Sequence, residues 1–194
     1  MKKIITIAAA ALLCISAFAQ GKEYLASYFG IKSNGEIDNT TSIQKAIDFI
    51  AEKGGGTLTF SVGRYLTGAV YLKSGVNIRL DAAADIIGTD SIYGYKGQKA
   101  IFNGIGVENI TIYTTRGNGV IDGRGDLVIK SFEDQKKKGF VTEETPVPTL
   151  LYFKDCKNIK LKKVLYRNPA VKGQWYIAEN SAVTVDGCFT DTRD

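Results

Sequence analysis

Four short stretches of the chain alternate apolar and polar residues with a period of two. They are NIRLD (77–81), NITIY (109–113), NIKLK (158–162) and AVTVD (182–186). Such alternation is typical of a β-strand with one buried face. The last two stretches begin 24 residues apart, and the earlier intervals of 32 and 49 residues are long enough for one repeat plus an insertion. A strand repeated in this way predicts the coils of a solenoid.

A second apolar pair follows two of these strands within about ten residues. The pairs are Ile86-Ile87 and Val120-Ile121, each closed by a glycine, which indicates more than one strand in each coil, joined around a corner. An antiparallel hairpin and a parallel β-helix are the competing interpretations. The hairpin is disfavoured because two-residue Asn-Gly or Asp-Gly turns between equal strands are not the rule here.

One segment has a helical period instead. Thr41 and Gln44 have the spacing of a capping box, and Gly54 to Gly56 would end the helix. The apolar residues between them recur at helical intervals: Ile43, Ala46, Ile47, Ile50 and Ala51. We therefore expect an N-terminal segment, residues 20–56, with a helix at about 41–53 that caps the first coil, and β-helix coils from 57 to 194.

The first 19 residues have the pattern of a signal peptide. Lys2 and Lys3 precede an apolar run, and Ala17-Phe18-Ala19 gives a small-x-small cleavage site. The run is too short to span a bilayer, so we expect an exported protein, periplasmic or extracellular, without a membrane anchor. A lipoprotein anchor at Cys14 is disfavoured by the bulky Leu13 before it.

Charge narrows the choice of ligand only slightly. Removal of Lys2 and Lys3 lowers the 25 basic residues to 23, against 20 acidic residues, and lowers the net charge from +5 to +3. This balance is compatible with a polyanionic ligand. Nucleic acid is not expected, because the basic residues are scattered and their densest run, Lys136 to Lys138, is interpreted as a solvated loop.

Two cysteines follow the signal peptide, and in an exported protein they could pair. If Val183 aligns with Ile159, then Cys188 aligns with Val164 at an inward position, whereas Cys156 lies ahead of its strand. We favour two separate thiols, with Cys188 a small core residue.

Several segments taken together resemble one known family. DNTTSIQKAI (38–47), GGGTLTF (54–60), GRYLTG (63–68) and LKSGV (72–76) resemble the N-terminal region of family 28 glycoside hydrolases, the polygalacturonase family. GVIDGRG (119–125) after NITI resembles that family's next segment, and residues 148–153 with Asn168-Pro169 and Trp175 resemble the one after it. The resemblance implies a right-handed, single-stranded parallel β-helix with a capping helix. It also implies a monomeric enzyme that hydrolyses galacturonan or a related pectic chain with inversion.

The chain departs from the family pattern in several places. Val62 replaces the usual proline before the Gly-x-Tyr turn, and the Asn-Ser-Pro-x-Trp turn is stretched to residues 168–175. The family's catalytic signatures, Asn-x-Asp, Asp-Asp, Gly-His-Gly and Arg-x-Lys, are absent, and the sequence contains no histidine. We therefore expect the N-terminal part of an enzyme, truncated at its C-terminal end and inactive alone, with the catalytic aspartates beyond Asp194. No catalytic, cofactor-binding or metal-binding residue is assigned.

Inverting hydrolysis needs two carboxylates about 6.5–9.5 Å apart. On a β-helix they would stand on one outward face of neighbouring coils, which stack about 4.8 Å apart. The candidates by residue type are Asp81, Asp122, Asp155, Asp186, Asp191 and Asp194. Most lie at strand ends or in Asp-Gly turns, where a turn-forming role is the favoured interpretation.

Aromatic residues and short motifs give further candidates. Tyr152, Tyr166, Trp175 and Tyr176 could stack on sugars, although packing in the core or between strands is favoured. The glycine-rich stretch 117–125 is not interpreted as a phosphate site, because no helix is expected after it. Arg124-Gly125-Asp126 matches an adhesion tripeptide that is expected often by chance. A calcium-dependent β-helix lyase, disfavoured because no aspartates cluster at ligand spacing, and a non-catalytic glycan-binding β-helix remain alternatives.

Overall fold

The computed structural model describes residues 21–173, 175–178 and 180–191. The expected signal peptide and Asp194 lie outside these residues. Within them, every strand pairing is parallel, which confirms the β-helix and excludes the hairpin interpretation.

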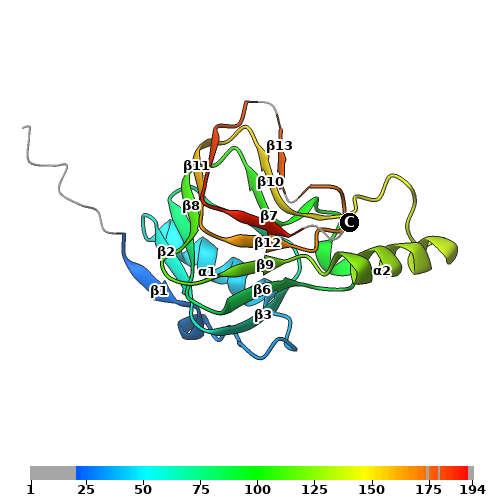
Figure 1. The fold of residues 1–194 in the computed structure, drawn as a ribbon, viewed down its shortest axis with the longest axis horizontal. Helices are drawn as coiled ribbons and strands as arrows, with labels where there is room; N and C mark the ends of the chain where they lie inside the picture. The colour runs from blue at the N-terminus through cyan, green and yellow to red at the C-terminus, as the bar shows by residue number, and fades with distance from the viewer. Residues whose placement is uncertain (1–20, 174, 179, 192–194) are drawn as a thin grey trace, which may run out of the picture.

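The strands form three sheets, which we name sheets A, B and C (Figure 1). Sheet A holds, in spatial order, β1 (Glu23–Leu25), β2 (Gly56–Phe60), β5 (Val76–Leu80), β8 (Glu108–Thr114), β11 (Lys157–Lys162) and β14 (Val183–Asp186). Sheet B holds β15 (Phe189–Asp191), β12 (Leu165–Arg167), β9 (Val120–Asp122), β6 (Ala84–Gly88) and β3 (Gly63–Thr67). Sheet C holds β13 (Trp175–Ile177), β10 (Thr149–Lys154), β7 (Ala100–Ile105) and β4 (Val70–Tyr71).

From β2 to β13 the chain visits the sheets in the order A, B, C and then returns to A, so that each of these four coils has three strands. The coil from β5 through β6 to β7, for example, is followed by the coil from β8 through β9 to β10. Two 3-10 helices, η1 (Ala26–Phe29) and η2 (Ile92–Tyr95), lie in the connections. The expectation of more than one strand in each coil is confirmed.

The period-two pattern lies in sheet A as expected. Ile159 is paired with Val183 and Leu161 with Val185, as the sequence alignment predicts. The two earlier repeats are offset, however, because Ile78 pairs with Ile112 rather than with Ile110. The side chain of Asn77 fixes this offset by accepting a hydrogen bond of 2.7 Å from the Thr111 N–H. A two-residue shift preserves the buried face, since side chains alternate with a period of two.

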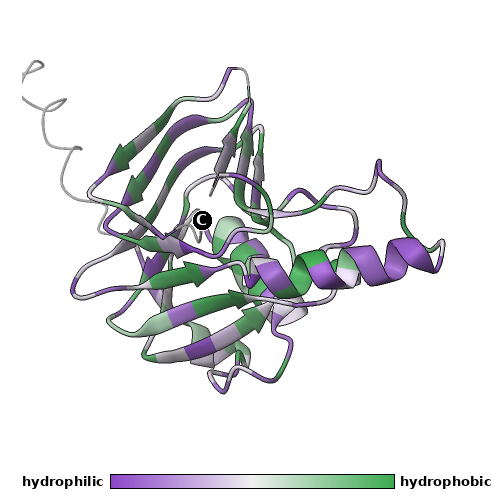
Figure 2. Cartoon of the chain, turned by 45° about the vertical axis from the view of Figure 1, so that its right-hand side comes forward, coloured by the Kyte–Doolittle hydropathy of each residue, from purple (hydrophilic) through white to green (hydrophobic). Residues whose placement is uncertain are grey.

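Side chains that point into the coils form one continuous core. In sheet A, Ile110, Ile112, Ile159 and Leu161 are fully buried. Apolar and polar bands alternate along the strands in Figure 2. Each such side chain contributes about 1.5–3 kcal/mol by leaving water, and this burial holds the coils together.

Helix α1 (Thr40–Glu52) covers the first coil, where Ile43, Ala46, Ile47 and Ile50 are fully buried. The predicted capping box is wrong, because the helix begins one residue earlier and Asp38 accepts the hydrogen bond from the Thr40 N–H. Gln44 instead bonds the backbone of Tyr71, accepting from its N–H at 2.7 Å and donating to its carbonyl at 3.1 Å. These bonds fasten the capping helix to β4.

Helix α2 (Gly125–Lys137) corrects two expectations. The glycine-rich stretch does open a helix, and Lys136 and Lys137 lie in its last turn rather than in a loop. The helix projects from the coils and only its first part lies against them (Figure 1). Its buried residues are Gly125, Val128 and Phe132. Val128 and Phe132 form a single apolar i, i+4 pair, which is too short a pattern to identify a helix from the sequence.

Both cysteines of the described part are free thiols, as expected. Cys156 is fully buried, and its Sγ lies 3.3 Å from the Gly104 carbonyl oxygen, to which the thiol donates. Cys188 lies beside Val164, as predicted, and is partly buried. Burial raises the pKa of the Cys188 thiol.

Candidate functional site

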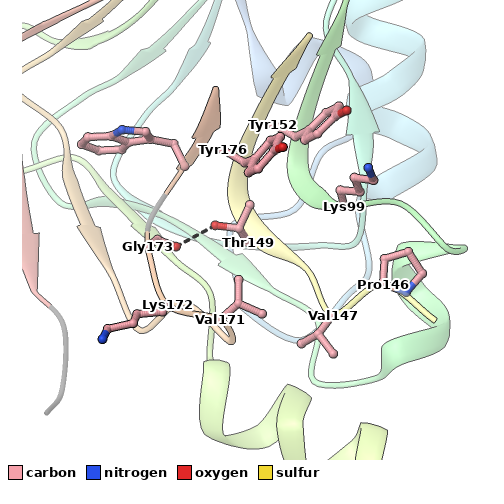
Figure 3. A pocket seen from close by; sticks show the side chains of 10 residues that line it. Lys99, Pro146, Val147, Thr149, Tyr152, Val171, Lys172, Gly173 and Tyr176 are labelled. Carbon is pink, nitrogen blue, oxygen red and sulfur yellow. Dashed lines mark hydrogen bonds between the residues drawn. The ribbon is translucent and has the colours of Figure 1, made fainter. Parts of the chain in front are cut away.

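A groove of about 310 Å³ lies on the outer side of sheet C. We call it the sheet C groove. It is lined by Lys99, Pro146, Val147, Thr149, Tyr152, Val171, Lys172, Gly173, Trp175 and Tyr176. Figure 3 shows these side chains, which come from three different coils.

Two stacked tyrosines form the floor of the groove. Tyr152 of β10 and Tyr176 of β13 are register partners on neighbouring strands, and their ring centroids lie 5.5 Å apart with planes only 6° apart. Tyr152 is buried and Tyr176 is 57% exposed. The Lys99 Nζ lies 5.0 Å from the centre of the Tyr152 ring, a cation–π contact (Figure 3). Tyr152 therefore lies between Tyr176 and Lys99, and Tyr176 is the exposed ring of the floor.

The two walls come from connections between strands. Pro146 and Val147 belong to the segment that returns from α2 to β10, and residues 171–173 belong to the connection from β12 to β13. The Thr149 hydroxyl donates a hydrogen bond of 2.8 Å to the Gly173 carbonyl, which joins the second wall to the floor. Each wall also has an apolar side chain, so the groove offers surface for a ring as well as for a charge.

The charge of the groove is positive. Lys99 and Lys172 are the charged residues among its ten lining residues, and no carboxylate is among them. Positive charge beside an aromatic surface favours an anionic ligand with a flat apolar face. Catalysis by paired carboxylates is not possible with these ten residues alone.

The aromatic candidates divide between this groove and the core. Tyr152, Trp175 and Tyr176 line the groove. Tyr166 is fully buried, packs edge-on against Trp175 at 5.4 Å, and has a pKa raised by burial. Core packing is thus confirmed for Tyr166, and Tyr176 shows strand packing, because it stacks on its register partner Tyr152.

Asp194 lies outside the described residues, and none of the other five candidate aspartates lines the groove. Asp81 pairs with Arg79 at 3.1 Å, and Asp155 accepts a hydrogen bond from Asn180. Asp186 and Asp191 are exposed at the ends of β14 and β15. The predicted turn role fits Asp81 and Asp155, which lie at corners between strands.

Asp122 is the buried member of this set. Its Oδ2 accepts a hydrogen bond of 2.8 Å from the Arg167 Nε, and its Oδ1 accepts from the Arg124 N–H and the Asn168 Nδ2. The register also differs from the sequence alignment, because Ile86 pairs with Ile121 and Ile87 with Asp122. Arg167 pairs in register with both Asp122 and Asp191, so that Arg167 stands between these two aspartates in sheet B.

The adhesion-like tripeptide has ordinary structural contacts. The Arg124 Nη2 lies 3.1 Å from the Asp90 Oδ2, and Gly125 begins α2. Within the described residues, no group of three or more acidic or cysteine side chains is placed to hold a metal ion. In the same part of the chain, no helix has the length and apolar character to cross a bilayer.

Sequence reasoning missed Lys99 and both walls of the groove. Lys99 directly precedes β7, and its carbonyl accepts a hydrogen bond of 2.8 Å from the Thr149 N–H of the next coil. Residues 99, 146–147 and 171–173 meet only because the coils stack, and no local pattern marks them. A position immediately before a sheet C strand is the one signal that could have suggested Lys99.

Comparison with known proteins gives consistent matches. The sequence model of glycosyl hydrolases family 28 matches residues 55–194. An exo-poly-α-D-galacturonosidase of Dickeya chrysanthemi is 32% identical over 114 residues, which are 50% of this chain and 19% of that protein.

Two solved structures have the same fold. A proposed glycosyl hydrolase of Parabacteroides merdae ATCC 43184 superposes with a TM-score of 0.82 and 39% identity, over 88% of this chain and 75% of that chain. The family 28 exopolygalacturonase of Yersinia enterocolitica superposes with a TM-score of 0.74 and 22% identity, over 91% of this chain and 40% of that chain. The chain spans about a fifth of the length of its curated Dickeya relative.

Proposed function

The chain belongs to family 28 of the glycosyl hydrolases, and on this premise we propose that it supplies the first coils and a substrate-binding groove of an enzyme that hydrolyses pectic polysaccharide. The sheet C groove is the observation on which the proposal rests. Tyr176 presents an exposed ring to a sugar, supported from behind by Tyr152, and Lys99 stands where a uronate carboxylate could be neutralised. A relative with partial identity acts on poly-α-D-galacturonate by name, which supports the same ligand class.

We place the acid and base of the proposed reaction outside these 194 residues. Inverting hydrolysis needs two facing carboxylates, and no carboxylate lines the groove. The six aspartates considered above are spread over separate corners, strand ends and one position outside the described residues. The match to only 19% of the Dickeya relative leaves room in a longer protein for coils with the catalytic aspartates.

Export is part of the proposal. The pattern of residues 1–19, with two lysines before an apolar run and a small-x-small site, supports a signal peptide. A polymeric substrate does not cross a membrane unaided, so export would bring the enzyme to it. N-terminal sequencing of the protein secreted by its natural host should begin at Gln20.

Binding to oligogalacturonate tests the groove directly. Trp175 is the one tryptophan of the sequence and lines the groove, so its fluorescence reports on occupancy. We expect saturable binding of oligogalacturonate to the full chain, about tenfold weaker for Tyr176→Ala and for Lys99→Ala. Tyr28→Ala is the matched control, because Tyr28 is 74% exposed and does not line the groove. Equal binding by all four proteins would contradict the proposed site.

The products separate hydrolysis from the alternatives. The full-length parent should release new reducing ends from polygalacturonate, whereas a lyase would give unsaturated ends that absorb ultraviolet light, and a binding module would give neither. The 194-residue chain alone should bind without cleaving, because the paired carboxylates are absent from its groove. A coding sequence that continues beyond Asp194 without paired aspartates would contradict the hydrolase assignment.

A further inference from the structure

Asp122 lies next to one wall of the sheet C groove but outside the groove itself. It is 7% exposed and stands at the end of β9, where the chain turns toward α2. Two of its three hydrogen-bond donors come from the next coil, Arg167 and Asn168. Charged groups buried in this way bind strongly to their donors and are costly to leave unpaired.

Backbone hydrogen bonds from the residues after Asp122 hold the same segment, Arg167 and Asn168. The Gly123 N–H donates to the Arg167 carbonyl at 3.0 Å, and the Gly125 N–H donates to the Asn168 carbonyl at 2.9 Å. A Cβ on Gly123 would lie 2.5 Å from the Asn168 carbonyl oxygen, and one on Gly125 would lie 2.3 Å from the Pro169 carbonyl oxygen. This approach leaves no space for a side chain, so the two coils are held together by backbone as well as by the carboxylate.

The segment of Arg167 and Asn168 is followed closely in sequence by the groove wall of residues 171–173. Asn168 has a φ of 49°, a left-handed conformation that asparagine adopts more readily than most residues other than glycine. Three residues later the chain reaches Val171, the beginning of the wall formed by residues 171–173. At the other end of the wall, Gly173 is bonded to Thr149. The wall is therefore anchored twice, once to the groove floor and once to Asp122 through Asn168.

We propose that Asp122 is a positioning residue for the sheet C groove, which holds in place the segment leading into the wall of residues 171–173. This inference rests on the proposed function of the groove. It assigns Asp122 no contact with the ligand. The carboxylate acts through Asn168, whose side-chain amide it orients.

The test compares Asp122→Asn with Asp81→Asn in the full chain. Asp81 is the matched control, because it too is a corner aspartate paired with an arginine Nε, at 3.1 Å from Arg79, and it does not line the groove. Asp122→Asn weakens the charge-assisted bond from the Asn168 amide to a bond between two amides, and it removes the charge that faces Arg167. Asn168→Ala removes the side chain through which the carboxylate is proposed to act, and the double variant Asp122→Asn with Asn168→Ala tests whether the two side chains act together.

Two measurements are made on each protein. Acrylamide quenching of Trp175 reports on the wall without any ligand, and titration with oligogalacturonate reports on affinity. We expect Asp122→Asn and Asn168→Ala each to be quenched more readily than the wild type and to bind about fivefold more weakly, with little further change in the double variant. Asp81→Asn should match the wild type in both.

A purely structural role of Asp122 would lower the melting temperature of Asp122→Asn and leave the quenching and affinity of the folded protein unchanged. That result would overturn the inference, as would effects of Asp122→Asn and Asn168→Ala that simply add in the double variant. If quenching changes as expected but the wild type binds no oligogalacturonate, the positioning of the wall stands and the proposed function fails.

Discussion

The two helices of this β-helix have the same length of 13 residues and opposite relations to its core. Helix α1 buries four apolar side chains completely over the first coil, whereas α2 buries two and leaves Leu127 and Ile129 more than 40% exposed. A helix that closes a solenoid must cover the whole cross-section of the core, so its apolar stripe is continuous. A helix inserted at a corner needs only enough contact to stay attached.

A carboxylate introduced into each helix should give the largest difference in stability between the two helices. Ile47→Asp in α1 buries a carboxylate at a fully buried position, and we expect a loss of at least about 4 kcal/mol in the free energy of unfolding. Ile129→Asp in α2, at a 42% exposed position, should change it by less than about 0.5 kcal/mol. Urea unfolding followed by circular dichroism measures both. Similar losses would mean that α2 is as integral to the fold as α1.

The attachment of α2 gives the next largest effect. Phe132→Ala removes one of the buried side chains that hold the helix, with an expected loss of about 3 kcal/mol in the local stability of α2. The backbone amides of α2 should then lose their protection from hydrogen exchange, while the amides of β8 and β11 remain protected. Loss of protection in both places would show that α2 and the coils unfold as one unit.

A smaller effect should come from the two glutamines that join the helices to the coils. Gln44→Ala removes two hydrogen bonds to the Tyr71 backbone, which should lower the free energy of unfolding by about 1–2 kcal/mol. Gln135→Ala removes an exposed bond from the Tyr93 hydroxyl and should cost less than about 0.5 kcal/mol. Thermal unfolding measures the loss of stability in both variants. A larger loss for Gln135→Ala than for Gln44→Ala would contradict this prediction.

The smallest expected change in stability depends on pH and concerns Tyr95, in the connection that contacts α2. Tyr95 ends η2, whose Ile92 N–H donates to Ser131 of α2, and burial raises the pKa of Tyr95 above its usual value. The raised pKa of Tyr95 contributes fully to the free energy of unfolding below the unfolded-state pKa of about 10. This contribution is lost as the pH rises above that value. At pH 10.5 the wild type should lose about 0.8 kcal/mol more than Tyr95→Phe, relative to pH 8. Parallel losses in urea unfolding would show that Tyr95 is not responsible.

Much of the fold follows from local sequence patterns, and the exceptions have physical causes. The alternation in 109–113 and 158–162 predicts strands whose inward residues are indeed buried, because the period of a strand is fixed by its geometry. Helix α1 is recognisable because five apolar residues recur at helical intervals. Helix α2 is not, since a single buried pair, Val128 and Phe132, could belong to many structures.

The candidate site was harder to predict than the fold. Tyr152, Trp175 and Tyr176 are visible as aromatic residues, but their gathering depends on the pairing of β10 with β13. Lys99 and the wall residues come from connections whose positions are fixed only when the coils stack. Residue type alone marked Asp122 as a carboxylate of interest, and the arrangement of Arg167 and Asn168 around it needed the structure.

The offset between Ile78 and Ile112 has an evolutionary consequence. Because only the parity of a shift decides which side chains face inward, a corner can gain or lose residues as long as the following strand slides by an even number. Length variation at corners is therefore nearly neutral for the core, and natural selection can try new loops there without rebuilding the interior. The insertion that forms α2, whose return segment supplies one wall of the groove, is what such freedom can yield.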